Sequence, residues 1–172
     1  SGDASGMSNP LAVTMTTNKT ISATFGSTGT EIVIDNADPG WSNTSPGGAA
    51  WIVGSIATVP KVGANYLYKT GTGASSITHS CRWTPEIAVA GLYDVYVFYQ
   101  IGANRTVGAT YNVFYNGGSV SSLQNQYSTT PNQGGWFLIG SNLPFAAGMG
   151  GYVELGNNTP DALAVSADAA KF

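Results

Sequence analysis

A histidine and a cysteine stand two positions apart in the segment "ITHSCRW", in a chain of 172 residues that has one residue of each type. Catalysis by such a base and nucleophile requires a third group that orients them in space. His79 and Cys81 share one face of the strand expected here, with Ile77 and Trp83 beside them. Because this face has the composition of a core, we expect Ile77, Cys81 and Trp83 inside. We expect His79 near the solvent end of the strand, and no catalysis at this pair.

Two further kinds of catalytic chemistry lack a convincing set of residues. A polysaccharide lyase can abstract a proton with tyrosine assisted by histidine or arginine, but the nine tyrosines of this chain are dispersed. A glycosidase needs two carboxylates about 5 to 9 Å apart across a cleft. The acids in motif-like settings, Asp35, Asp38 and Asp168, have settings typical of structural positions. The sequence therefore assigns no catalytic residue, and a small lyase or hydrolase is the least favoured interpretation.

The same three carboxylates are the candidate metal ligands. Calcium binds several oxygen atoms, and "DNAD" at 35–38 would meet "ADA" at 167–169 if the first and last strands pair. Alternatively, Asp38 starts an Asx-type turn with the proline and glycine that follow, and Asp168 forms a salt bridge with Arg105. The sequence requires no cofactor and leaves a structural calcium ion open.

Charge and hydropathy exclude several classes of partner. Charged residues make up 9% of the chain, and the formal net charge is −3. A nucleic acid or an anionic membrane needs a concentrated basic surface, whereas the six lysines and arginines here are scattered. One cysteine makes no disulfide framework, and no apolar run approaches the roughly 20 residues that span a bilayer. We therefore expect a soluble globular protein with neither nucleic acid nor membrane as a partner.

Aromatic residues among neutral polar residues are the main functional signal. A sugar ring has apolar C–H faces edged by hydroxyl groups, so its binding site needs flat aromatic surface and hydrogen-bonding groups. Trp41, in "DPGWSNTS", is expected in an exposed loop, and Tyr127 beside Gln126 in "QNQYSTT" is expected in another. Trp51 is expected to anchor its loop to the body. The remaining aromatic residues assigned to loops are Tyr66 and Tyr68 in "NYLYK".

A second aromatic group is expected on a sheet. In "GLYDVYVFYQI", Tyr96 and Phe98 alternate with residues predicted to face the core. Phe114 and Asn112 occupy equivalent positions on the strand expected beside it. We predict a platform on the outer face, with Gln100 at its edge, which either binds a glycan or is covered by another segment. The residues predicted to form the core are Trp83, Tyr93, Val95, Val97, Tyr111, Val113 and Trp136.

The elements that would position these residues are short strands. Runs of β-type residues recur about every 8 to 12 residues with turn signals between them, which is the pattern of an antiparallel β-sandwich or barrel. A boundary is expected at "FGSTGTE". The sequence before it predicts a hairpin over 1–25, as the end of a truncated neighbouring domain or a linker, and residues 26–172 are the working domain. Because Ser1 is not a natural start residue, we expect a piece of a longer protein.

Several segments of the working domain follow one another in a recognisable order. They are "IVIDNADPGW" at 32–41, "CRWTPEIAVAGLYDVYVFY" at 81–99, "NRTVGATYNVFYNGG" at 104–118, "QNQ" at 124–126, "GGWFLIG" at 134–140, "PFAAG" at 144–148, "GYVELGNN" at 151–158 and "VSADAAKF" at 165–172. This set resembles the golvesin and xanthan lyase C-terminal family, a carbohydrate-binding-like domain. The resemblance implies a jelly roll of the galactose-binding-like kind, bacterial origin, export and no catalytic residue. Cys81 stands where the family usually has a small residue, which implies a buried, passive thiol. Residues 1–25 resemble the closing strands of internalin B-repeat domains.

The function predicted from these features is non-catalytic polysaccharide binding by a module of a secreted or cell-surface bacterial protein. The predicted ligand-binding residues are Trp41, Tyr96, Phe98, Arg105, Asn112, Phe114, Gln126 and Tyr127. Arg105 could reach a sugar carboxylate or sulfate, or form the buried pair with Asp168. The alternative function is a structural or adhesive spacer in which both aromatic groups are covered. The expected partners are a polysaccharide or oligosaccharide and neighbouring domains of the same chain, and the module is expected to be monomeric.

Overall fold

A computed structural model describes residues 16–18, 20, 31–44, 50–73 and 76–172. The chain divides into two compact units between Thr30 and Glu31, whereas the sequence placed the boundary between residues 25 and 26. In the first unit the described residues are exposed, and the hairpin predicted there lies outside the described residues. The second unit, Glu31–Phe172, carries all the strands that the described residues form.

The second unit is built from β-strands. Among its described residues there is no helix, and hence none long and apolar enough to cross a membrane. The strands are β1 (Val33–Ile34), β2 (Trp41–Thr44), β3 (Ile52–Gly54), β4 (Tyr66–Lys69), β5 (Ser80–Trp83), β6 (Gly91–Ile101), β7 (Ala109–Tyr115), β8 (Gly118–Gln124), β9 (Gln133–Phe145), β10 (Tyr152–Gly156), β11 (Val165–Ala167) and β12 (Ala169–Lys171). Alternation in β6 places Val95, Val97 and Tyr99 on its core face. The β-branched and aromatic side chains of these strands pack well on a pleated sheet, which favours the extended backbone.

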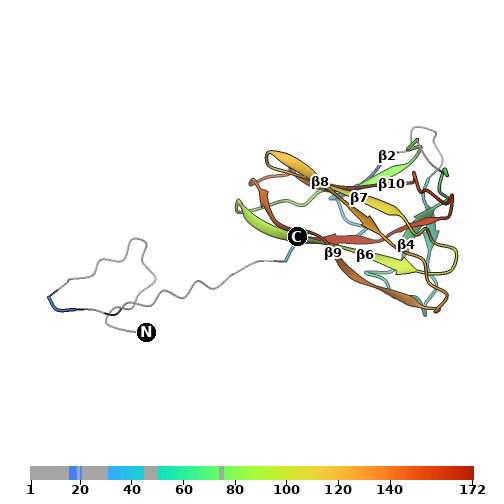
Figure 1. Ribbon diagram of the computed structural model, residues 1–172, viewed down its shortest axis with the longest axis horizontal. Helices are drawn as coiled ribbons and strands as arrows, with labels where there is room; N and C mark the ends of the chain where they lie inside the picture. Colours follow the sequence, from blue (N-terminus) through green and yellow to red (C-terminus); the bar gives the residue numbers. More distant parts are fainter. Residues whose placement is uncertain (1–15, 19, 21–30, 45–49, 74–75) are drawn as a thin grey trace. The chain divides into compact units, whose positions relative to one another are not determined.

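Two sheets pack face to face. One contains four strands in the order β1-β12-β6-β9, and the other contains five strands in the order β2-β5-β10-β7-β8. Figure 1 shows them as separate layers, with β7, β8 and β10 in one and β6 and β9 in the other. The strand pairs of the described residues are all antiparallel. The predicted antiparallel β-sandwich of the jelly-roll type is therefore confirmed.

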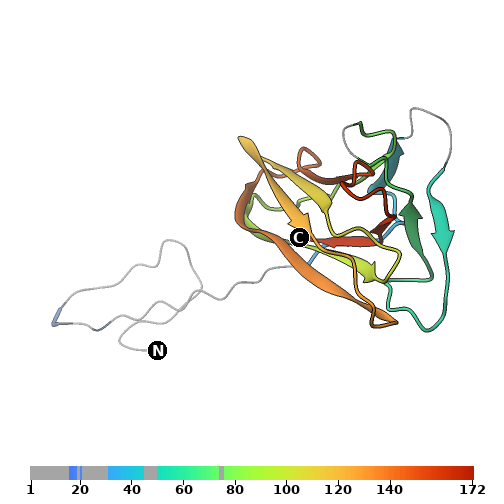
Figure 2. The same ribbon diagram turned by 45° about the vertical axis from the view of Figure 1, so that its right-hand side comes forward.

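A smaller sheet, in the order β11-β4-β3, lies at one end of the sandwich, where Figure 2 shows β3 in teal and β4 in green. β11 and β12 follow one another with Asp168 between them, so the last segment belongs first to the small sheet and then to the four-stranded sheet. In β4, Tyr66 and Tyr68 alternate with Leu67. Because side chains alternate along a strand, the two tyrosines share one face of the small sheet.

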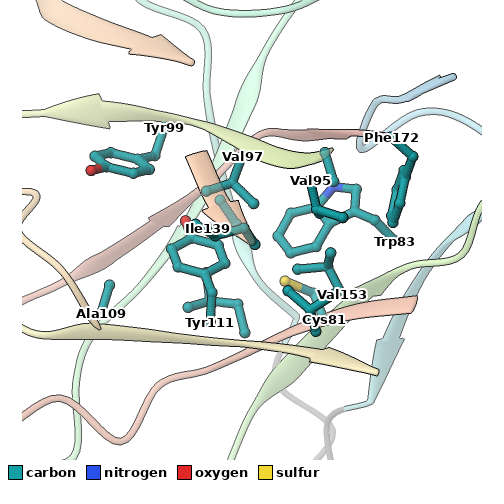
Figure 3. Packing of buried hydrophobic residues seen from close by; sticks show 14 of the residues in the cluster. Cys81, Trp83, Val95, Val97, Tyr99, Ala109, Tyr111, Ile139, Val153 and Phe172 are labelled. Atoms are coloured by element: carbon teal, nitrogen blue, oxygen red, sulfur yellow. The ribbon is translucent and has the colours of Figure 1, made fainter. Parts of the chain in front are cut away.

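The apolar core lies between the two main sheets. In Figure 3, Val95, Val97 and Tyr99 of β6 face Tyr111 of β7 and Val153 of β10. These five side chains are at most 1% exposed. Burial of so much apolar and aromatic surface is the main favourable term in folding.

Most of the core predicted from the sequence is confirmed. The correctly predicted residues are Trp83, Val95, Val97, Tyr111 and Val113, which are buried, and Tyr93, which packs half-buried against the core. Trp51 is buried at 4% exposure, as expected for an anchor. Trp136 was wrongly predicted, because β9 turns Phe137 and Ile139 toward the core and leaves Trp136 on the outer face. Ile77 was also wrong, since it is 45% exposed and precedes the start of β5.

The beginning and the end of the second unit lie side by side. Ile32 and Phe172 exchange two backbone hydrogen bonds of 3.0 Å, and β1 pairs with β12 at the edge of the four-stranded sheet. Asp35 follows β1 directly, and Asp168 directly precedes β12. This pairing therefore brings the two carboxyl groups together, as the sequence predicted for paired terminal strands.

Candidate functional site

A cavity of about 500 Å³ lies at the end of the sandwich that carries the small sheet. Its walls come from β3, β4 and the loop between them, from the end of β6 and the loop that follows, and from the segment that leads into β9. A cavity of this volume is typical of sites for small molecules. It is the candidate functional site of the part of the chain that the structure describes.

Two tyrosines of β4 give the cavity its aromatic surface. Tyr66 is 4% exposed and packs directly against Gly54 of β3, where a Cβ atom would come within 2.3 Å of the tyrosine ring. The Tyr68 ring is half-buried, with its centroid 6.3 Å from that of Tyr66 and the ring planes inclined at 40°. Glycine at position 54 therefore makes room for the Tyr66 ring beside the cavity.

Arg105 lines the cavity beside these rings and is 6% exposed. Its guanidinium carbon lies 5.0 Å from the ring centroid of Tyr68 and 5.9 Å from that of Tyr66, which are cation–π distances. Nη1 donates to Oδ1 of Asn104 at 3.0 Å. Nε, in contrast, is buried with no hydrogen-bond partner among the described residues. Burial lowers the pKa of Arg105, the two tyrosines act in the opposite direction, and arginine keeps its charge in proteins.

The loop after β6 is fixed by its main chain. The Arg105 N–H donates to the Gly102 carbonyl at 3.1 Å, and the Thr106 N–H donates to the Ala164 carbonyl at 2.9 Å. The Thr106 carbonyl accepts from the Gln126 N–H at 2.9 Å. The segment therefore lies between the residues that follow β8 and those that precede β11. This backbone network positions the Arg105 side chain.

Gln126, predicted to contact the ligand, has a structural role instead. It is fully buried, and its Nε2 donates to the Tyr111 hydroxyl at 3.1 Å and to the Ser166 carbonyl at 2.8 Å. Its Oε1 accepts from the Ser166 N–H at 2.7 Å. The prediction was wrong because the side chain turns inward and its hydrogen-bonding atoms are occupied. Gln126 joins the segment after β8 to β11 and to the core.

Gln100 connects the cavity to a buried carboxyl group. It lines the cavity, and its Nε2 donates to the Pro60 carbonyl at 3.0 Å and to Oδ2 of Asp168 at 2.8 Å. Oδ2 of Asp168 also accepts from the Val62 N–H at 2.9 Å. These bonds hold the loop between β3 and β4, which forms one wall of the cavity, against β6. The sequence placed Gln100 at the edge of an outer platform, whereas it is 2% exposed.

The carboxyl groups of Asp35 and Asp168 lie close enough for each to influence the protonation of the other. Burial and the nearby Asp35 charge raise the pKa of Asp168 to about 7, against hydrogen bonds that favour its charged form. Burial also raises the pKa of Asp35. The predicted salt bridge between Asp168 and Arg105 does not form, and Arg105 has no ion-pair partner among the described residues.

The three calcium candidates come together only in part. Asp35 and Asp168 are in contact, but Oδ2 of Asp38 accepts from the Asp35 N–H at 2.8 Å and so closes its own turn. Over the residues that the structure describes, no group of three His, Cys, Asp or Glu side chains is arranged to hold a metal ion. The contacts are those of a structural turn and a carboxyl pair.

Of the two loop aromatics predicted to bind the ligand, one is misplaced. Trp41 is not in a loop: it begins β2 opposite Trp83 of β5 and packs half-buried against the core, with its indole nitrogen buried. Tyr127 is 40% exposed and precedes Ser128, which lines the cavity. Tyr127 therefore lies close to the site in sequence without forming its wall.

The predicted platform is divided between the two sheets. Tyr96 and Phe98 lie on β6 of the four-stranded sheet, whereas Phe114 and Asn112 lie on β7 of the five-stranded sheet. Alternation was predicted correctly for each strand, but β6 and β7 are not neighbours. The loop between them crosses from one sheet to the other, so the four residues share no surface.

Each half of the divided platform is completed by other residues. Phe98 meets Trp136 of β9 edge-on, with ring centroids 5.3 Å apart, and Nζ of Lys171 lies 4.8 Å from the Trp136 ring centroid. On the other sheet, Phe114 stacks on Tyr152 with centroids 4.5 Å apart. None of these side chains lines the cavity.

His79 and Cys81 do not form a catalytic pair. Cys81 is fully buried, and burial raises the pKa of its thiol. His79 is 9% exposed rather than near solvent, its Nδ1 lies 3.0 Å from the Thr78 hydroxyl, and its Nε2 has no partner in the described part of the chain. A base that contacts no thiol cannot activate it.

Residues 32–172 match the family model described as the golvesin C-terminal domain. The chain belongs to the golvesin C-terminal domain family. The resemblance drawn from the ordered segments is thereby confirmed over this range. The likeness of residues 1–25 to an internalin repeat stays a prediction.

Relatives of this golvesin domain include parts of larger proteins. Xanthan lyase from Bacillus sp. (strain GL1) is 34% identical over 111 residues, which are 64% of this chain and 11% of the relative. The structure of a Paenibacillus xanthan lyase has a TM-score of 0.69 and 27% identity, over 83% of this chain and 13% of that one. A family 35 carbohydrate-binding module from an environmental isolate shares the fold, with a TM-score of 0.57 and 17% identity over 81% of this chain and 91% of that one. The golvesin domain thus spans a small part of the xanthan lyases.

Sequence reasoning found Arg105 but missed the other main residues of the cavity. Tyr66 and Tyr68 were recognised as aromatic but were assigned to a loop, whereas they lie on β4. The alternation in "NYLYK" was a signal that could have placed them on one face of a strand. Gln100 was noticed only as the edge of the predicted outer platform, and Asn104 gave no signal that distinguished it from other polar residues.

Proposed function

We propose that this golvesin domain is a non-catalytic carbohydrate-binding module that holds part of a polysaccharide in the end cavity. The observation that carries the proposal is the lining of the cavity. Two tyrosine rings lie there beside a guanidinium and neutral polar groups. Aromatic rings can stack on the C–H faces of a sugar, while polar groups at the edge bond its hydroxyls.

The polar side chains of the lining are of types that can form hydrogen bonds with the hydroxyl groups of a sugar. Amide side chains come from Asn104 and Asn132, and hydroxyl side chains come from Ser128 and Thr130. Amides and hydroxyls can both donate and accept hydrogen bonds, as a sugar hydroxyl requires. The cavity therefore offers partners around the rings without a catalytic pair of carboxylates on its walls.

The family and the fold support an accessory role. The domain shares its fold with a carbohydrate-binding module and corresponds to 11% of the length of a xanthan lyase. We propose that it works beside other domains of the same chain in a secreted or cell-surface bacterial protein, as a monomer, with a polysaccharide or oligosaccharide as its partner. Its proposed contribution is to hold the parent protein on the glycan.

The test is affinity electrophoresis of the full chain through gels that contain plant, algal or bacterial polysaccharides. We expect retardation by at least one glycan, and loss of that retardation in Tyr68→Ala, which removes a cavity ring. Tyr152→Ala is the matched control, since it removes a half-buried tyrosine from the outer face of the five-stranded sheet. The control is expected to bind as the unaltered chain does.

Three results would contradict the proposal in different ways. Retardation lost only in Tyr152→Ala would move the site to the sheet face. No retardation across the panel would favour the structural spacer. Release of sugar products by the chain alone, lost in His79→Ala, would make it an enzyme.

A further inference from the structure

The guanidinium of Arg105 is a buried cation without an anion. The residue is 6% exposed and lines the cavity, and no carboxylate among the described residues pairs with it. The ion pairs of the described residues are instead Arg82 with Glu154 and Lys171 with Glu31. A charge withdrawn from water is costly unless it is paired and hydrogen-bonded, so Arg105 is an unusual side chain to find inside this fold.

The protein compensates this charge only in part. The faces of Tyr66 and Tyr68 stabilise the cation, the Tyr66 side chain also favours the charged form as a hydrogen-bond partner, and Asn104 accepts one hydrogen bond from Nη1. Nε still has no acceptor. Asp168, the buried carboxyl group expected to pair with Arg105, is bonded to Val62 and Gln100 instead. Because Arg105 lines the cavity, an anionic group bound there would lie near this charge.

We infer that the cavity selects a sugar that carries a carboxylate, such as a uronic acid, and that Arg105 is the specificity-determining residue that receives it. This inference rests on the proposed sugar-binding function of the same cavity. A carboxylate would supply the missing anion and accept hydrogen bonds from the guanidinium, whose planar geometry matches that group. Low exposure makes such a bond stronger than it would be on the surface. The tyrosine rings would meanwhile hold the apolar face of the sugar.

The experiment is an NMR titration of the full chain with d-glucuronate, d-galacturonate and d-mannuronate, each compared with its methyl ester. Each acid and ester pair has the same ring and differs in the charge, so the comparison isolates the carboxylate. The Nε–H resonance of Arg105 reports on the guanidinium directly. We expect at least one uronate to shift this resonance together with those of Tyr66 and Tyr68, and to bind at least ten times more tightly than its ester.

Two variants separate recognition of the carboxylate from folding. Arg105→Met fills the same volume without charge, and since the buried charge is unpaired we expect the domain to remain folded with equal or higher thermal stability. The variant should bind the acid and its ester equally. Arg105→Lys should retain part of the preference. Lys171→Met is the control, because it removes a cation from the outer face and should leave the preference unchanged.

The outcomes distinguish this inference from the proposed function. Equal binding of acids and esters, or a preference that survives Arg105→Met, overturns the inference and leaves the sugar site in place. If neutral polysaccharides retard the chain and no uronate shifts its resonances, the inference is likewise overturned and the sugar site stays in place. The titration also includes galactose 6-sulfate. If this sulfated sugar binds and no uronate binds, the assignment of the ligand group to a carboxylate is overturned. If Arg105→Met fails to fold, the comparison of acid and ester on the unaltered chain still shows whether the cavity prefers a carboxylate.

Discussion

The space between the two main sheets and the end of the sandwich beside the small sheet are buried in different ways. Between the sheets the side chains are apolar or aromatic, and the polar atoms of Trp83 and Tyr111 donate to the carbonyls of Asp168 and Ser166 at 3.1 and 3.2 Å. At the end of the sandwich, buried polar side chains gather, and Arg105 Nε and Asp168 Oδ1 have no hydrogen-bond partner among the described residues.

The contrast separates stability from binding. Burial of apolar surface stabilises the sandwich, and a side chain whose hydrogen bonds are made within the fold gains nothing from a ligand. The polar end contains groups whose hydrogen bonds or charges are incomplete in the chain alone, which is what a site prepared for a polar ligand requires. Substitutions between the sheets should therefore change stability strongly, whereas substitutions at the cavity should change binding more than stability.

The largest effect is expected for Trp83→Ala. The side chain is fully buried between the sheets, so its removal should lower the free energy of unfolding by about 3 to 5 kcal/mol. Urea unfolding followed by tyrosine and tryptophan fluorescence would measure the loss. Trp136→Ala is the control, because it removes the same type of residue from the outer face. It should lower the free energy of unfolding by less than half as much. Equal losses would mean that the two main sheets do not enclose the core.

The next effect concerns pH and the carboxyl pair at the polar end. The pKa of Asp168 is about 7 in the folded chain against an ordinary value of 3.8, so the folded state holds more protons between these values. The free energy of unfolding should therefore be greatest below about pH 4 and fall as the pH rises through 7, by about 1.4 kcal/mol per pH unit. Urea unfolding between pH 4 and 8 would measure it.

Asp168→Asn separates the contribution of this group from that of the others. Its amide oxygen can still accept from Val62 and Gln100 but does not titrate, so the fall in stability with pH should largely disappear. Asp94→Asn is the control, because Asp94 is exposed and its hydrogen bonds to Ser141 and Asn142 lower its pKa. Stability that stays flat in the unaltered chain from pH 4 to 8 would contradict the carboxyl pair.

A smaller effect should distinguish two adjacent residues near the site. Gln126→Ala removes a buried amide and leaves the Ser166 N–H without the Gln126 acceptor, which should cost about 1 to 3 kcal/mol in unfolding free energy. Tyr127→Ala alters an exposed side chain and should stay within about 0.5 kcal/mol of the unaltered chain. Thermal and urea unfolding would measure both. A larger loss for Tyr127→Ala would reverse their assigned roles.

The smallest effect is expected on the outer face of the five-stranded sheet. Arg82 pairs with Glu154 at 2.6 Å and lies 4.4 Å from the ring centroid of Tyr152, but its side chain is 39% exposed. Arg82→Ala should therefore cost less than about 1 kcal/mol in unfolding free energy. It should leave glycan retardation unchanged, because the face is remote from the cavity lining. A loss of binding in this variant would place the site on that face.

The sequence predicted which side chains share a face of a strand better than it predicted which strands are neighbours in a sheet. Alternation in β6 identified Val95 and Val97 as inward residues, because a strand presents opposite side chains to opposite faces whatever sheet it joins. It could not show that β6 and β7 belong to different sheets, so Phe98 and Phe114 were wrongly combined. β2 was missed altogether, since "WSNT" has little β-type pattern and is held by pairing with the distant β5.

The site was less predictable than the fold. Whether a polar residue turns inward depends on partners far away in the sequence, and Gln126 finds its partners in β7 and β11. "NRT" likewise gives no indication that Arg105 lies beside two rings of β4. The composition did predict the kind of surface, aromatic rings among amides and hydroxyls, because that depends on residue types alone. Which of these residues meet is decided by the strand order.

The pairing of β1 with β12 also determines how the domain responds to force. The two strands are antiparallel, and Ile32 and Phe172 exchange hydrogen bonds at one end of the pair. A force applied to residues 31 and 172 therefore acts in the unzipping geometry, in which the hydrogen bonds between the two strands break one after another rather than together. β1 would peel away under low tension while β3, β4 and β6 still enclose the cavity, so the domain could lengthen before it releases what it holds.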